Sequence, residues 1–554
     1  MAQAALGLDF GTASVRAVVV DVLRGRELGA AVTPYAHGVM DRRVPGIRGA
    51  LPPDWALQHP RDYLDGLRQA VRGALRAART KPERVCGIGV DFTACTILPT
   101  CRDGTPICYK TAMNRQPNAY VKLWKHHAAQ AQADALNRLA QERREPWLKH
   151  YGAGVSCEWL IPKAHQVADE SPEVYDAADR WLEAGDWVVG QLTGDYKRNA
   201  CAAGYKGCYV PGRGDPSPDF LRALHPKLAH LPSKLPREVV PAGTRVGGLT
   251  AEWARTLGLK KGTPVGAAII DAHAAVAASG LSAPGEMALI LGTSFCHMLL
   301  GAGDARDDCA GISGSVRDGI LPGLMGYEAG QAGGGDLWAW CAEACGNTAL
   351  LKEARAAKRS VHEELARRAA RYKPGATGLL ALDWHNGNRS PLNRSDLSGL
   401  LVGLTLSTPP EAIYRALQES LSFGTRTIVE NFERQGLPVN RIVCSGGIAH
   451  KDPPFLQMLA DVTGREIEVA RSTQACGVGA AILGAIAAGP DGGGHPDFAS
   501  AAQAMGGVRA RRFRPSKEAA KTYSELYAGY TELSDYFGRG GSDLMGRLKA
   551  WRKP

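Results

Sequence analysis

The sequence lacks the features that would place it in a membrane or outside the cell. Its most apolar segment, residues 264–281, is interrupted by Asp271 and His273, so it is a poor membrane span. The N-terminus has no basic start before its apolar stretch, and Asp9 breaks that stretch. We therefore expect no signal peptide and no membrane contact, and we expect a cytoplasmic protein.

Disulfide frameworks and common metal motifs are also missing. The chain has 13 cysteines, an odd number, and no two of them stand at C-x-x-C spacing. This distribution indicates neither a zinc site nor a redox motif. Cysteines such as Cys341 and Cys345 are predicted to be small buried hydrophobic residues, which fits a reducing compartment.

The most familiar nucleotide-binding motifs are absent as well. No G-x-x-x-x-G-K-[ST] sequence occurs, which excludes a P-loop enzyme. Gly477-Val478-Gly479 is only a fragment of a dinucleotide-binding motif, because the third glycine is not at the required spacing. Close packing of a helix explains these glycines better.

The formal net charge of +11 is not accompanied by a nucleic-acid-binding motif. Basic residues are dispersed, and only the tail groups them, at Arg547, Lys549, Arg552 and Lys553. No zinc finger, homeodomain or RNA-binding signature occurs. We interpret the basic residues as solvated surface with some attraction for anionic substrates, and we expect no nucleic acid partner.

What the chain does have is enough residues for two large domains. Its 554 residues, 45% hydrophobic and 22% charged, are typical of a globular protein but too many for one core. Residues 6–21 predict two strands around a Gly11-Thr12 turn, residues 60–79 a helix, and residues 85–90 a buried strand. This alternation predicts an α/β domain.

The second half restarts the same pattern. Another predicted strand–turn–strand unit surrounds Gly292-Thr293, and when the two units are overlaid Gly11-Thr12 falls on Gly292-Thr293. Asp9 then falls on Ile290, so only the first turn carries a carboxylate. We predict two domains of common design, residues 1–281 and 282–554; chance similarity between two hairpins is the alternative.

A third glycine-rich turn, Ser445-Gly446-Gly447, follows a predicted strand at residues 441–445. Glycine lets backbone N–H groups approach phosphate oxygens, and a Ser or Thr hydroxyl adds a donor. One such turn means little, since hairpins need glycine anyway. Three of them, one preceded by an aspartate, point to a nucleotide site.

These residues resemble a known superfamily. Asp9-Phe10-Gly11-Thr12 with Ser14, Gly292-Thr293 and Ser445-Gly446-Gly447 resemble the two phosphate loops and the adenosine loop of actin and the sugar kinases. Residues 117–124 resemble the first signature of the FGGY carbohydrate kinases. Within that family, ribulokinases are the group that this chain resembles most specifically, at residues 91–96, 120–127, 156–163, 203–206, 270–274 and 326–331. Cys157 in place of a serine, and a loosely matching region after Gly399, depart from the pattern.

The resemblance implies an α/β fold of two ribonuclease H-like domains with nucleotide and sugar in a central cleft. It implies ATP and Mg²⁺ as cofactors, with Asp9 holding the metal through water; turn capping by Asp9 is the alternative. The implied nucleotide-binding residues are Gly11, Thr12, Ser14, Gly292, Thr293, Ser445, Gly446 and Gly447.

The resemblance also implies a sugar site. Asp271 follows a predicted strand at residues 265–270 and would be the general base, a role compatible with capping the next helix. Lys206, Glu328 and the backbone around Ala94 would bind the sugar, although Lys206 and Glu328 taken alone could equally be surface residues. A sugar-facing or a packing role stays open for Lys122, Trp124, His126 and His127, and the adjacent histidines are no metal pair.

The expected activity is ATP-dependent phosphorylation of L-ribulose at O5, in L-arabinose catabolism. A sister kinase acting on D-ribulose, xylulose or glycerol is the main alternative. An actin-like ATPase is the alternative from another class, but it would have no use for Asp271, Lys206 and Glu328 as hydroxyl-handling groups. A homodimer is left open, because no pattern in the sequence reports the oligomeric state.

Overall fold

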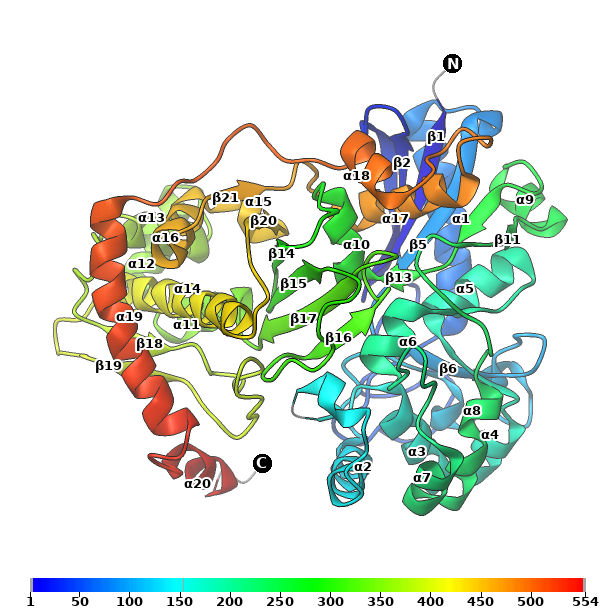
Figure 1. The fold of residues 1–554 in the computed structure, drawn as a ribbon, viewed down its shortest axis with the longest axis horizontal. Helices are drawn as coiled ribbons and strands as arrows, with labels where there is room; N and C mark the ends of the chain where they lie inside the picture. Colours follow the sequence, from blue (N-terminus) through cyan, green and yellow to red (C-terminus); the bar gives the residue numbers. More distant parts are fainter. Residues whose placement is uncertain (1–2, 153, 552–554) are drawn as a thin grey trace.

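The computed structural model describes residues 3–152 and 154–551, and its two halves lie side by side (Figure 1). The first half is built on a seven-stranded sheet with the order β11-β12-β5-β1-β2-β3, with β13 also paired to β5. Its strands are β1 (Ala4–Phe10), β2 (Ser14–Asp21), β3 (Glu27–Pro34), β5 (Val85–Phe92), β11 (Arg245–Gly248), β12 (Pro264–Gly266) and β13 (Ile269–Ile270).

The first sheet confirms the elements predicted at its centre. Strands β1 and β2 form the expected antiparallel hairpin, and β1 runs parallel to β5. Helix α1 (Pro60–Ala78) packs on this sheet through an apolar stripe that includes Tyr63, Leu67 and Val71, all fully buried. The 3.6-residue period of that stripe is the reason that the helix could be predicted.

The second sheet has the order β16-β17-β15-β14-β20-β21. Its central part, β17-β15-β14-β20-β21, repeats the order β3-β2-β1-β5-β12 of the first sheet, with three antiparallel strands followed by two parallel ones. This order is that of a ribonuclease H-like fold, and it confirms the predicted common design. The strands are β14 (Glu286–Leu291), β15 (Phe295–Gly301), β16 (Gly314–Arg317), β17 (Met325–Gln331), β20 (Arg441–Ser445) and β21 (Ile467–Val469).

Two small-residue helices, α10 (Asp271–Ala278) and α17 (Ala475–Ala488), join the sheets through a shared apolar cluster. Glycines make the contact possible. A Cβ on Gly7 would lie 1.9 Å from the carbonyl oxygen of Gly477, and one on Gly479 would lie 2.0 Å from that of Ala274. Close helix packing is therefore the role of the Gly477-Val478-Gly479 segment, as its sequence predicted.

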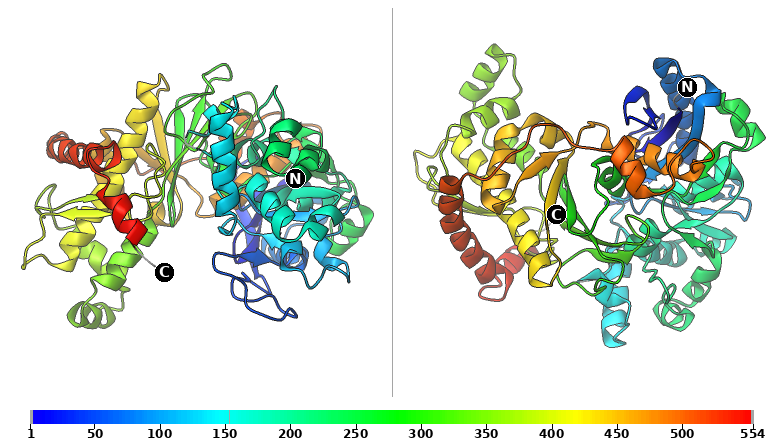
Figure 2. Two further views of the ribbon diagram at one scale, coloured as in Figure 1. Left: turned by 90° about the horizontal axis from the view of Figure 1, so that it is seen from below. Right: turned by 45° about the horizontal axis from the view of Figure 1, so that its top comes forward.

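The chain returns to its first half near its end. Helices α17 and α18 (Phe498–Met505) belong to the second half of the sequence, yet they lie beside β1 and β2 in Figures 1 and 2. The domain boundary between residues 281 and 282 remains a prediction. It assigns α17 and α18 to the second domain, although these helices lie beside the first sheet.

The remaining elements surround the two sheets. The first half also holds a small sheet of β4 (Leu57–Gln58), β7 (Val121–Lys122), β6 (Ile97–Thr100) and β8 (Arg180–Glu183), and the pair β9 (Arg198–Asn199) and β10 (Val239–Val240). Its other helices are α2 (Gln130–Glu142), α3 (Leu160–Glu170), α4 (Pro172–Ala177), α5 (Ala184–Thr193), α6 (Ala200–Lys206), α7 (Pro218–Leu224), α8 (Leu231–Lys234) and α9 (Ala251–Leu257). The second half adds β18 (Leu380–Leu382), β19 (Leu400–Val402), α11 (Gly335–Ala344), α12 (Thr348–Ala356), α13 (Val361–Ala369), α14 (Pro410–Arg434), α15 (Gly447–Lys451), α16 (Pro453–Thr463), α19 (Lys517–Gly538) and α20 (Leu544–Trp551).

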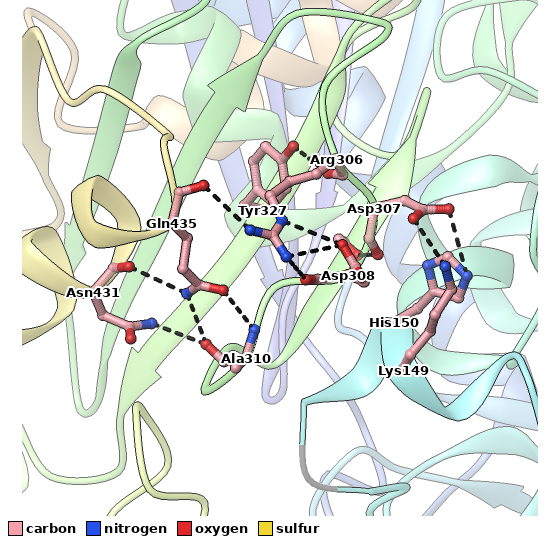
Figure 3. A network of polar contacts seen from close by, with 10 residues as sticks. Lys149, His150, Arg306, Asp307, Asp308, Ala310, Tyr327, Asn431 and Gln435 are labelled. Carbon is pink, nitrogen blue, oxygen red and sulfur yellow. Dashed lines mark hydrogen bonds and ion pairs between the residues drawn. The ribbon is translucent and has the colours of Figure 1, made fainter. Parts of the chain in front are cut away.

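A second bridge between the halves lies on the loop that joins β15 to β16 (Figure 3). Asp307 on this loop lies 3.2 Å from the Nζ atom of Lys149 and 3.8 Å from Nε2 of His150, both in the first half. The Tyr327 hydroxyl donates to the carbonyl oxygen of Arg306 at 2.6 Å and anchors the loop to β17. Because the Lys149–Asp307 pair is solvent-exposed, it contributes at most about 1 kcal/mol to the attachment of the two halves.

Other expectations concern the surface and the cysteines. All 13 cysteines are free thiols. Cys341 is fully buried as predicted, whereas Cys345 is only partly buried at the edge of the same apolar cluster. In the basic tail, Arg547 pairs with Asp543, while Arg552 and Lys553 lie outside the described residues. Within the described ranges, no helix combines the length and the apolarity needed to cross a bilayer.

Candidate active site

The predicted first phosphate loop is a tight turn that is held from outside the sheet. The Gly11 N–H donates to the Ser14 carbonyl oxygen at 3.0 Å and closes the turn. The Trp124 indole N–H donates to the Thr12 hydroxyl at 3.0 Å, and the Gln58 amide donates to the Thr12 carbonyl oxygen at 2.8 Å. Residues from the small sheet region therefore fix the loop before any phosphate arrives.

Three carboxylates gather beside this loop. Asp9 and Asp91 are register partners on the parallel strands β1 and β5. Asp91 is fully buried, and among the described residues no N–H or hydroxyl group donates to its oxygens; its side-chain partner is the Asp9 carboxyl group. Burial raises the pKa of Asp91 well above its usual range, and the charges of Asp9 and Asp271 add to this. Arg16 lies 3.1 Å from Asp9 and offsets only part of the charge. Carboxylate oxygens are the ligand type that hard divalent cations prefer, and Asp9 offers them directly beside the loop.

Asp271 begins helix α10 and faces the same region. Its carboxylate accepts the Ala272 N–H at 2.7 Å, while Ile270, not Asp271, occupies the N-cap position of the helix. Burial and, to a smaller extent, the charge of Asp9 raise the pKa of Asp271 to about 7, although the Ala272 N–H and the charge of Lys206 oppose this rise. A carboxylate with a pKa near neutrality can accept a proton from a hydroxyl group efficiently at physiological pH.

Lys206 and Glu328 meet across the two halves. The Nζ atom of Lys206, at the end of α6, donates to both Glu328 oxygens on β17, at 2.9 and 3.0 Å. His273, two residues beyond Asp271, lies 3.4 Å from the same carboxylate. Burial disfavours the charge on each group, but the attraction between the two opposite charges has the larger effect. The pKa of Lys206 is therefore raised, and that of Glu328 is far below its usual range. The charge of Lys206 also acts on Asp271.

Ala94 lies in a turn, residues 93–96, that follows β5. Cys95 adopts the left-handed conformation with φ of 53°, which a cysteine rarely does without support. The Thr96 hydroxyl lies 2.8 Å from that of Thr93 and 3.2 Å from the Ala94 carbonyl oxygen. The turn is therefore held by its own side chains, and Ala94 within it is only partly buried.

The second half contains a pocket of about 920 Å³ beside the second glycine-rich turn. Its lining includes Gly292, Thr293 and Gly447 of the predicted nucleotide residues, together with Trp338 and Tyr414. An aromatic and apolar wall next to glycine-rich turns is a suitable environment for a base with attached phosphates.

The third glycine-rich turn and the start of helix α11 lie beside this pocket. Gly446 has φ of 92°, and a Cβ there would lie 2.5 Å from the Leu291 carbonyl oxygen, so glycine is required. Ser445 ends β20 as the register partner of Ile290. The N-terminal end of α11 starts on the turn, where the Asp336 N–H donates to the carbonyl oxygen of Thr293 at 3.3 Å.

The structure adds residues to which the sequence analysis gave no role. Arg389, on the loop between β18 and β19, reaches over Gly330 on the face of β17 that also carries Glu328. Among the described residues its guanidinium has no hydrogen-bond or ion-pair partner. Burial alone would raise the pKa of Glu158, but its His127 hydrogen bond and the charge of Arg389 lower it. Arg389 can be recognised only from its contacts with segments far away in the chain. Asp91 could have been found from the sequence, because it directly follows the predicted buried strand at residues 85–90.

The four residues left open divide into two pairs. Lys122 is buried and donates to the Asn118 side chain at 2.7 Å. His126 is also buried and accepts the Ala56 N–H at 3.2 Å. Both are therefore packing residues. Trp124 holds the first phosphate loop, and His127 lies 3.0 Å from Glu158. Among the described residues, no group of three or more histidine, cysteine or carboxylate side chains has the arrangement of a metal centre.

Comparisons with known proteins cover nearly the whole chain. Residues 4–278 match the N-terminal domain, and residues 287–488 the C-terminal domain, of the FGGY family of carbohydrate kinases. A ribulokinase of Geobacillus thermodenitrificans is 49% identical over 550 residues, 99% of this chain and 97% of that protein. A ribulokinase of Shouchella clausii is 47% identical over 553 residues, 100% of this chain and 98% of that protein. A solved xylulose kinase from Rhodospirillum rubrum has a TM-score of 0.77 at 23% identity, with 96% of this chain and 98% of that chain covered, and it shows the same two-domain fold.

Proposed function

Because the chain belongs to the FGGY family of carbohydrate kinases, we propose that it transfers the γ-phosphoryl group of ATP to O5 of L-ribulose. The products are L-ribulose 5-phosphate and ADP, a step that the resemblance to ribulokinases assigns to L-arabinose catabolism. The free thiols support a cytoplasmic location for this reaction.

The observation that carries this proposal is the buried Lys206–Glu328 pair, which bridges the two halves and acts electrostatically on Asp271. A ketopentose has a carbonyl and several hydroxyl groups, so it needs donors and acceptors together. The ammonium group, the carboxylate and the backbone at Ala94 supply both. A site of this kind discriminates strongly against compounds that lack those hydroxyls, because its polar groups would then be left unpaired.

The chemistry requires a base, a positioned hydroxyl and support for the transferred phosphoryl group. Asp271 is the base and accepts the proton from the attacking O5 hydroxyl. Backbone N–H groups of the two glycine-rich turns, around Gly11 and Gly292, hold the phosphates on either side. The aromatic pocket of the second half holds the adenine.

Magnesium fits the carboxylates beside the first phosphate loop. The buried oxygens of Asp91 and the adjacent Asp9 form a donor set of the type that hard cations prefer. Asp9 would hold the ion, with Asp91 behind it. When bound, Mg²⁺ neutralises charge on the phosphate oxygens.

The test is a comparison of kcat/KM for L-ribulose, D-ribulose, xylulose and glycerol at saturating Mg-ATP, with the phosphorylated position assigned by NMR. We expect L-ribulose to be preferred, other ketopentoses to react more slowly, glycerol to be very poor, and the phosphate to be on O5. A preference for xylulose or glycerol of about tenfold or more, or phosphate on O1, would overturn the ribulose assignment and leave a carbohydrate kinase of another specificity.

A further inference from the structure

Lys163 is a fully buried lysine on α3 whose ammonium group binds backbone rather than acid. Its Nζ atom donates to the carbonyl oxygen of Cys95 at 2.6 Å and to that of Leu123 at 2.8 Å. In the described part of the chain no carboxylate lies within ion-pair distance of it. Burial lowers the pKa of Lys163, as expected for a positive charge removed from water. Because the buried ammonium group is bonded only to two carbonyl oxygens, its role is to hold these two backbone segments in place.

One of these carbonyls belongs to the turn that presents Ala94. Cys95 holds its left-handed conformation while its carbonyl oxygen is bonded to Lys163. The hydroxyl contacts of Thr93 and Thr96 stabilise the turn from within, but they do not connect it to the rest of the site. The Thr93 N–H joins the turn to the Phe10 carbonyl oxygen at 3.1 Å, and Lys163 adds a second connection, from helix α3, that also reaches the Leu123 segment.

The other carbonyl leads to the first phosphate loop. Leu123 is followed by Trp124, whose indole N–H donates to the hydroxyl of Thr12 at 3.0 Å. The Leu123 N–H is itself held by the Ala56 carbonyl oxygen at 3.0 Å. A single ammonium group therefore joins the sugar-facing turn to the segment that braces the phosphate loop.

We propose that Lys163 is a positioning residue that sets the distance between bound sugar and the first phosphate loop. The proposal rests on the proposed function, because it takes the turn at Ala94 as part of the sugar site. Phosphoryl transfer depends on such alignment, and a displacement on the order of 1 Å can cost about 100-fold in rate. Lys163 does this without touching the sugar or the nucleotide.

The experiment replaces Lys163 with methionine, which keeps most of the apolar length of the side chain and removes its donors. The probe is the sugar that the wild-type enzyme phosphorylates best, with sugar affinity measured by calorimetry in the presence and absence of a non-hydrolysable ATP analogue. We expect kcat/KM for the sugar to fall by roughly 10- to 100-fold. The ATP analogue should bind alone with nearly unchanged affinity, and the mutual enhancement between sugar and nucleotide should shrink.

The matched control is Lys122→Met. Lys122 is also fully buried and lies on the neighbouring strand β7, but it donates to the Asn118 side chain and lies 4.3 Å above the ring of Trp55. The Lys122→Met variant should lose stability as Lys163→Met does, but its KM for the sugar should stay at the wild-type value. Lys163→Gln retains one donor on a shorter chain and should fall between wild type and Lys163→Met.

The outcomes separate the two proposals. If the wild-type enzyme phosphorylates no sugar, the proposed function fails first, and the role of Lys163 fails with it. If a sugar other than L-ribulose is preferred, only the substrate assignment is lost. Equal sugar affinity and equal sugar–nucleotide coupling in Lys163→Met and wild type would overturn the positioning role. So would the same loss in Lys122→Met, or failure of both Lys163 variants to fold, since either result would mark a purely structural residue.

Discussion

The tips of the two ribonuclease H-like sheets have the same strands and turns but different side chains. Asp9 on β1 has Asp91 as its neighbour on β5, whereas at the equivalent places β14 carries Ile290 and β20 carries Ser445. The helix that follows the last parallel strand starts with Asp271 in the first half, while α17 in the second half starts with Ala475.

The two halves therefore share a fold but carry different chemical groups at equivalent positions. Both halves keep the glycine turn, because its backbone N–H groups can hold phosphate whatever the side chains are. The carboxylates, to which we assign metal binding and proton transfer, occur at these three places in the first half alone. The second half uses the same region for an apolar and aromatic pocket of about 920 Å³. Substitutions at equivalent tips are therefore the sharpest test of the comparison.

The largest effect is expected at the start of α10. Asp271→Asn keeps the shape of the side chain and removes the base, so kcat should fall by roughly 10²- to 10⁴-fold while ATP affinity changes little. Steady-state kinetics and nucleotide binding by calorimetry measure both quantities. A folded variant that turns over at nearly the wild-type rate would remove Asp271 from the role of base.

A smaller effect is expected at the strand tips. Asp9→Asn should raise the Mg²⁺ concentration needed for half-maximal activity and lower the rate by roughly 10- to 100-fold, as expected for a residue that holds metal through water. Ile290→Asn is the matched change in the other half and should leave the Mg²⁺ titration where it is. Identical titration curves for wild type and Asp9→Asn would show that the two tips do not differ in this way.

The pH dependence tests the same carboxylate region without mutation. Burial and the charge of Asp9 raise the pKa of Asp271 to about 7, and only the deprotonated form can accept the hydroxyl proton. Activity is therefore retained above this pKa and lost as the pH falls through it. We expect kcat/KM for the sugar to decrease about tenfold per pH unit below 7. A profile that stays flat between about pH 5.5 and 7.5 would contradict the assignment.

The smallest expected signal is a change of shape. Phosphate turns in both halves must meet one nucleotide, so the halves should close when sugar and ATP are both bound. Small-angle scattering of the wild-type protein with the sugar and a non-hydrolysable ATP analogue should give a smaller radius of gyration than the unliganded protein. Unchanged scattering at occupancies verified by calorimetry would argue against closure.

Much of this arrangement could be predicted because it depends on local pattern. The alternation in residues 6–21 and 287–300 specified both hairpins, and the glycine-rich turns specified the places where phosphate could approach. The same reasoning gave the period of α1 and the close packing at Gly477-Val478-Gly479.

The rest depends on contacts between segments far apart in the chain. Lys206 and Glu328 are separated by 122 residues, and nothing local distinguishes their ion pair from two surface charges. The same holds for Arg389 over Gly330, for the Lys163 bonds to two carbonyls, and for the return of α17 to the first sheet. Asp91 had a local sign, an acid in an apolar strand, but its importance comes from its register with Asp9.

We propose that the protein uses ATP to phosphorylate a sugar and does not hydrolyse ATP to drive a change of shape. ADP formation by the wild-type protein with Mg-ATP, measured with and without L-ribulose, distinguishes the two activities. We expect ADP to form at an appreciable rate only when the sugar is present, with one sugar phosphate formed for each ADP. ADP formation at the same rate without sugar, and with no phosphorylated sugar in its presence, would contradict it.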